Sequence, residues 1–139
     1  MNQNNFAAEC VRFICQHYKV KPNDINTGIA VDISQVYSAS GIVKLLKEIG
    51  FFACELRTNT RGLVDSPKPV IVQTTAHFLV VVDASAAGVT IMEPSEKRNH
   101  RVAFPDFVKA WTGAVIVIEP PQKTLSFFEK TVRRFFNDH

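Results

Sequence analysis

The chain has 139 residues, of which 46% are hydrophobic and 21% are charged. This length and composition are typical of a single folded domain with one core, and they exclude extended disorder. The net charge of +3 gives little support for nucleic-acid binding. No apolar run approaches the roughly 18 residues of a membrane-spanning helix, and the polar N-terminus does not predict a secretory signal.

The cysteines are three in number, Cys10, Cys15 and Cys54, and their spacing is not typical of a metal site. This usage predicts reduced thiols in a cytoplasmic protein and no bound metal. The chain also lacks a glycine-rich loop of the kind that holds nucleotide phosphates. We therefore expect no cofactor in this domain.

The first predicted element is a helix over residues 6–18, with Asn4 or Asn5 as its cap. Cys10 lies one turn into this helix and is interpreted first as a small hydrophobic residue of the core. Residues 19–36 carry two turn signals and predict a short helix or an irregular connection. Apolar spacing places one stripe along the first helix, made of Phe6, Cys10, Phe13, Ile14 and His17.

A second helix is predicted over residues 38–49, started by Ser38 or Ser40 and ended by Gly50. Residues 51–57 then predict a strand, and residues 58–69 predict a loop that contains a glycine and two prolines. The buried stripe of the helix is Ile42, Leu45, Leu46 and Ile49. The strand alternates, and the more apolar set is expected to face the core: Phe52, Cys54 and Leu56.

Residues 69–83 contain two β-type runs, joined by a polar insert short enough to be a hairpin loop, and residues 89–92 predict a third strand. His77 lies at the entrance of the second run and Glu93 at the end of the third. Antiparallel pairing brings these positions together and predicts a hydrogen bond between them. An imidazole held by a carboxylate is the orienting half of a nucleophilic site, although a surface histidine near a solvated acid gives the same pattern.

The rest of the domain is predicted as a surface loop over residues 95–100, a short helix over 104–111 and a final strand over 114–118. A proline begins the helix and Gly113 is expected to end it. Trp111, on this helix, fits either a plain core position or a place in a binding groove.

Two prolines at positions 120 and 121 mark a boundary between a domain of residues 1–121 and an amphipathic linker helix within residues 122–139. Ser126 and Glu129 form a capping box at the start of the helix. Such a helix packs back on the domain, lies at a membrane surface or leads into a following domain, and the sequence leaves these alternatives open. Its apolar stripe is Phe128, Val132, Phe135 and Phe136, opposite Lys130, Arg133 and Arg134.

Three short motifs, His77–Phe78, Glu93–Pro94 and Trp111–Gly113, follow the two helices. Together they resemble the papain-like peptidase domain at the N-terminus of bacterial ABC exporters for bacteriocins, over roughly residues 5–119. The resemblance implies an α+β papain-like cysteine-peptidase fold, with N-terminal helices packed on a mostly antiparallel sheet. In active members, a cysteine at the start of the first helix attacks the bond after a double glycine in a leader peptide.

For an active peptidase, the resemblance implies Cys10 as nucleophile, His77 as base, Glu93 as its orienter and Gln3 or Asn4 as oxyanion donor. A helix N-terminus and a neighbouring imidazolium both stabilise a thiolate, which is the physical reason for this arrangement.

The chain departs from the active pattern, because Cys10 is flanked by Glu and Val where active members have Asp-Cys-Gly. If His17–Tyr18 corresponds to a Tyr-rich pair of the family, the nucleophile position falls on Phe6 and Cys10 is a core residue. This pattern resembles the peptidase-like domains of type I secretion exporters for RTX toxins and adhesins. In those domains the nucleophile is lost, often to an aromatic residue, and unfolded cargo is bound instead of cut.

The resemblance therefore predicts a non-proteolytic domain of a type I secretion ABC exporter, at the cytoplasmic face of the bacterial inner membrane. The expected role is recruitment of a secreted polypeptide near Phe6, His77 and Trp111. Its expected partners are the transmembrane and nucleotide-binding domains of the same exporter, where ATP would be used, and it would dimerise only through the full exporter. An active leader peptidase and a free-standing immunity-type binding module are the alternatives.

Overall fold

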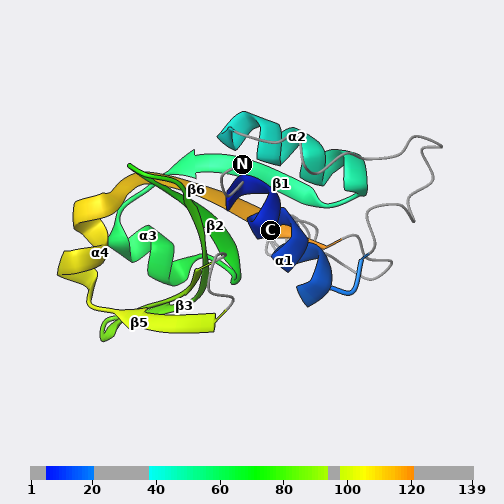
Figure 1. Ribbon diagram of the computed structural model, residues 1–139. Helices are drawn as coiled ribbons and strands as arrows, with labels where there is room; N and C mark the ends of the chain where they lie inside the picture. Colours follow the sequence, from blue (N-terminus) through cyan, green and yellow to red (C-terminus); the bar gives the residue numbers. More distant parts are fainter. Residues whose placement is uncertain (1–5, 21–37, 94–97, 121–139) are drawn as a thin grey trace, which may run out of the picture.

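The computed structural model describes residues 6–20, 38–93 and 98–120 (Figure 1). Among the helices of these ranges, none has the length and apolar character that crossing a bilayer would need. The helices are α1 (Phe6–His17), α2 (Ala39–Ile49), α3 (Thr60–Asp65) and α4 (Phe104–Ala110). The strands are β1 (Phe52–Arg57), β2 (Val70–Thr74), β3 (Phe78–Ser85), β4 (Gly88–Glu93), β5 (Arg98–Val102) and β6 (Trp111–Glu119).

The strands form one antiparallel sheet in the order β1-β6-β2-β3-β4-β5. The last strand, β6, inserts between β1 and β2, so the last part of the described chain lies inside the sheet and not at its edge (Figure 1). Val80 of β3 pairs with Met92 of β4, which puts the start of β3 beside the end of β4. The predicted α+β fold, with helices packed on an antiparallel sheet, is confirmed.

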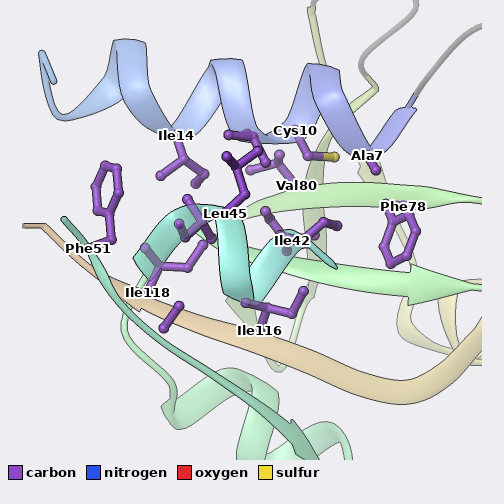
Figure 2. Close-up of a cluster of buried hydrophobic side chains, with 14 of the residues drawn as sticks. Ala7, Cys10, Ile14, Ile42, Leu45, Phe51, Phe78, Val80, Ile116 and Ile118 are labelled. Carbon is purple, nitrogen blue, oxygen red and sulfur yellow. The ribbon is translucent and has the colours of Figure 1, made fainter. Parts of the chain in front are cut away.

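Helices α1 and α2 cover one face of the sheet and form the larger core cluster with it (Figure 2). The α2 boundaries agree with the sequence, because the Gly41 amide donates to the Ser38 hydroxyl at 3.0 Å and Gly50 ends the helix at φ +123°. The α1 stripe differs at one predicted position, since His17 is exposed. The buried side chains of α1 are Ala7, Ala8, Cys10, Val11, Ile14 and Cys15.

A second core cluster lies on the opposite face, beneath α3 and α4. The predicted loop over residues 58–69 is wrong, because its centre folds into α3. The Gly62 amide donates to the Asn59 side chain at 2.9 Å, and Leu63 is fully buried against the sheet. A helix of six residues with one buried leucine is too short to show helical periodicity in its sequence.

Two further boundaries differ from those predicted. The predicted loop over residues 95–100 overlaps β5, which pairs with β4 along its length. The helix expected to end at Gly113 ends at Ala110, and Trp111 already begins β6. Gly113, at φ +94°, lies inside the strand at a conformation that favours glycine.

The predicted facing of β1 is also wrong. Ala53 is buried, whereas Phe52 is 48% exposed, Leu56 is 47% exposed and Cys54 is exposed as well. The reason is that α2 packs on the Ala53 side of this edge strand, and its Ile49 leads through Gly50 into the buried Phe51. The apolar content of the strand predicted that Phe52, Cys54 and Leu56 would be buried. The position of α2 instead buries the opposite face, which carries Ala53.

Several predictions fall outside the described residues. These are the helix cap at Asn4 or Asn5, most of the connection over residues 19–36, and the linker helix within residues 122–139. They remain predictions.

Candidate functional site around His77

A tight turn at the end of β2 holds His77. The Thr74 amide donates to the His77 carbonyl at 2.8 Å, and the His77 and Ala76 amides donate to the Thr74 hydroxyl at 3.0 and 3.2 Å. The same hydroxyl lies 3.2 Å from His77 Nδ1. Thr74 is buried, so the imidazole is oriented by a side chain that is itself fixed in the sheet.

Thr74 was not among the site residues predicted from the sequence. The signal was present, because a threonine at the end of an apolar run commonly bonds to amides two and three residues later. The segment Gln73–His77 carries this pattern.

Phe6, at the start of α1, packs edge-on against the His77 ring. The two ring centroids are 4.2 Å apart and the planes make an angle of 72°. Both side chains are half-buried. The helix start therefore presents an aromatic ring, where a nucleophilic site would need a thiol or hydroxyl facing the imidazole.

Cys10 lies in the core, on the underside of α1 (Figure 2). Its relative exposure is 0%. It is one turn beyond Phe6, which corresponds to about 6 Å along the helix axis at ~1.5 Å per residue. Burial raises the pKa of the Cys10 thiol, and the negative charge of Glu9 raises it further. A neutral thiol away from solvent is a poor nucleophile.

Glu93 is the last residue of β4 and pairs with Arg98 at the start of β5. The register of β3 and β4 places its backbone at the same end of the sheet as His77. The side chain of Glu93 lies outside the part of the chain that the structure describes, as do Gln3, Asn4 and Pro94. The predicted hydrogen bond from His77 to Glu93 thus remains a prediction.

Trp111 is held by the second core cluster. Its ring lies 5.3 Å from that of Phe107, and its indole N–H donates to the Ala114 carbonyl at 3.0 Å. Its backbone pairs with Thr74, so Trp111 is joined to the His77 turn through the sheet. The structure brings Phe6 and His77 into ring contact and packs the ring of Trp111 with Phe107.

A hollow of about 590 Å³ lies between the outer side of α1 and the paired strands β4 and β5. Phe13 and Met92 give it apolar surface, while Arg12 and Arg98 bring positive charge. Glu9 also lines the hollow and forms an ion pair with Arg12 at 2.7 Å. This volume falls in the range of about 300–1,000 Å³ that is typical of ligand sites.

In the part of the chain that the structure describes, no group of three or more histidine, cysteine or acidic residues is arranged to hold a metal ion. The chemistry available at this site is that of an imidazole and an aromatic surface.

Comparison with known proteins connects this geometry to a family. Residues 1–123 match the model of the Peptidase C39 family. A search of curated protein sequences found no match.

Solved structures share the fold at low sequence identity. A double glycine motif protease from an AMS/PCAT transporter, solved with its leader peptide, has a TM-score of 0.70 and 18% identity, over 86% of this chain and 87% of that one. The peptidase domain of Streptococcus ComA, a bifunctional ABC transporter of a quorum-sensing pathway, has a TM-score of 0.68 and 21% identity, over 88% and 95%.

A third structure is the N-terminal peptidase C39-like domain of a toxin secretion ATP-binding protein from Vibrio parahaemolyticus. It has a TM-score of 0.64 and 10% identity, over 84% of this chain and 98% of that one. These similarities establish the fold and extend over nearly the whole length of each matched domain.

Proposed function

The chain belongs to the Peptidase C39 family, and from this premise we propose that it is a non-proteolytic substrate-recruiting domain of a type I secretion ABC exporter. As part of such an exporter, it would lie at the cytoplasmic face of the inner membrane, beside the transmembrane and nucleotide-binding domains. The resemblance to solved domains of ABC transporters supports this setting.

The observation that carries the proposal is the contact between Phe6 and His77. The ring of Phe6 faces the imidazole from the helix start, while the thiol of Cys10 is buried one turn further on. Proteolysis by a thiol requires the sulfur within hydrogen-bond reach of its base. An aromatic ring in this place offers binding surface instead of a nucleophile.

The hollow beside α1 supports the recruiting role. It combines apolar and charged surface, which suits an extended polypeptide without requiring one particular sequence. It borders Met92, next to Glu93 at the end of β4, so cargo in the hollow would lie near the His77 turn. Trp111 stays a predicted cargo contact only: its backbone pairs with Thr74, while its ring packs with Phe107 in the second core cluster.

The experiment uses reduced and carboxymethylated α-lactalbumin, a permanently unfolded polypeptide, as the probe. Fluorescence anisotropy of the labelled probe should show binding to the chain, and Phe6→Ala should weaken it at least about threefold, as expected for loss of one aromatic contact. Val108→Ala is the matched control, because it trims an exposed apolar side chain of α4, away from Phe6 and His77. Equal affinity for both variants and the unsubstituted chain would contradict the proposal.

The second candidate is a leader peptidase, with Cys10, His77 and Glu93 as its catalytic residues and Gln3 or Asn4 as oxyanion donor. The observation that favours it is the retained histidine, held in place by Thr74 at the entrance of β3. Incubation with a synthetic double-glycine leader peptide, followed by mass spectrometry, separates the candidates. We expect no cleavage, whereas cleavage that is lost in Cys10→Ala would establish the peptidase.

A further inference from the structure

The outer face of β1 is an exposed apolar strip, formed by Phe52, Cys54 and Leu56. Phe52 is 48% exposed and Leu56 is 47% exposed, and these are two of the three large hydrophobic side chains most open to solvent in the described chain. The other face of the strand is covered by α2 through Ala53. β1 is also the edge of the sheet, so the strip lies at a border of the fold.

The described chain ends beside this strip. Glu119, the last residue of β6, pairs with Phe52, the first residue of β1. Pro120 follows directly, and residues 121–139 continue from there. The next part of the chain therefore starts at one end of the strip.

The sequence that follows has an apolar face of its own. Residues 126–136 carry a capping box and a helical stripe of large apolar side chains, set against basic residues. The stripe consists of Phe128, Val132, Phe135 and Phe136.

The dimensions of the strip and of the predicted helix agree. The five residues 121–125 span at most about 18 Å, which is enough to turn over the edge of the sheet. A helix of residues 126–136 would be about 16 Å long at ~1.5 Å per residue. Phe52 and Leu56 are four positions apart on a strand, or about 13 Å.

We propose that the chain's own segment 126–136 docks as an amphipathic helix on the strip, with its apolar stripe over Phe52, Cys54 and Leu56. The basic side chains of the segment then face outward. Docking removes from water two apolar surfaces that each element alone leaves exposed. It also fixes the direction in which the chain leaves the sheet.

Cys54 lies at the centre of the strip and reports on this docking. The other two thiols are buried, with Cys10 at 0% and Cys15 at 3% exposure, so alkylation at Cys10 or Cys15 signals unfolding. The test measures the rate at which N-ethylmaleimide modifies Cys54 in the 139-residue chain, by mass spectrometry of each cysteine.

Phe128→Asp, in the apolar stripe, should raise the Cys54 rate at least about tenfold, because the docked population falls when the stripe gains a charge. Lys130→Gln makes the same change in net charge on the basic side of the proposed helix, opposite the stripe, and should leave the rate unchanged. Phe135→Asp is the second stripe variant, used if Phe128→Asp exposes Cys10 or Cys15.

Equal Cys54 rates in the unsubstituted chain and the stripe variants would overturn the proposal. If the Cys54 rate falls as the protein concentration rises and is the same in the stripe variants, a second copy covers the strip. That result would overturn the proposal as well. The test does not depend on the recruiting function, because it reports only on Cys54 and the segment that follows β6.

Discussion

Replacement of Cys10 by alanine and by serine separates a core cysteine from a catalytic one. A nucleophile in a cleft contacts water and tolerates a hydroxyl of similar shape. A thiol at 0% exposure, packed in the larger core cluster between α1, α2 and the sheet, does not contact water and does not tolerate a hydroxyl in its place. The order of stability of the two variants therefore reports where the side chain lies.

The magnitudes follow from the burial. Cys10→Ala removes one buried sulfur, which we expect to cost about 1–2 kcal/mol, made up of the lost transfer free energy and a small cavity. Cys10→Ser loses a similar apolar contact and also buries a hydroxyl, at a cost of about 1–3 kcal/mol. A bond from that hydroxyl to the Phe6 carbonyl, four residues earlier in the helix, recovers part of the cost. We expect Cys10→Ser to be less stable than Cys10→Ala by about 1 kcal/mol.

Urea unfolding, followed by circular dichroism, measures the difference. With a dependence of about 2 kcal/mol per molar urea, the two midpoints should differ by about 0.5 M. The matched control is Ala86→Ser in the exposed turn between β3 and β4, which should change the stability by no more than about 0.5 kcal/mol. A serine variant at least as stable as the alanine variant would refute the assignment of Cys10 to the core.

Three further predictions concern the fold. Leu63→Ala should destabilise the chain by about 2–5 kcal/mol in urea unfolding, because Leu63 is fully buried and anchors α3; a cost below 1 kcal/mol would mean that α3 does not pack on the sheet. Gly88→Ala should lower the thermal midpoint, since φ is +148° and the added Cβ would lie 2.8 Å from the Val102 carbonyl oxygen; an unchanged midpoint would contradict the β3–β4 turn. Burial raises the pKa of Cys15 from its ordinary 9.0 to about 11, so the folded state holds this proton more tightly than the unfolded state. Stability should be retained below pH 9 and fall towards pH 11, and a Cys15→Ala variant should show a smaller fall in its urea midpoint over that interval.

The sequence predicted the elements whose pattern is local and long. The α2 boundaries follow from a serine cap and a terminal glycine, and the hairpin at His77 follows from two β-type runs with a short polar insert. The placement of Cys10 in the core followed from helical spacing, because one turn separates it from the start of α1.

The remaining features depend on contacts that are distant in sequence. The facing of β1 was wrong because α2, not the apolar content of the strand, decides which side is buried. β5 was missed because its polar residues form a strand only by pairing with β4. The role of Thr74 depends on a turn that aims one hydroxyl at the amides and the ring of His77.

The most direct test of a core, non-catalytic Cys10 is its reactivity towards iodoacetamide in the folded chain, measured from pH 6 to 9 by mass spectrometry. We expect Cys10 to stay unmodified across this range, in the unsubstituted chain and in His77→Ala alike, because the thiol is neutral and buried. Rapid alkylation of Cys10 near neutral pH, slowed by His77→Ala, would contradict it. That result would place a thiolate beside the imidazole and make the chain a peptidase.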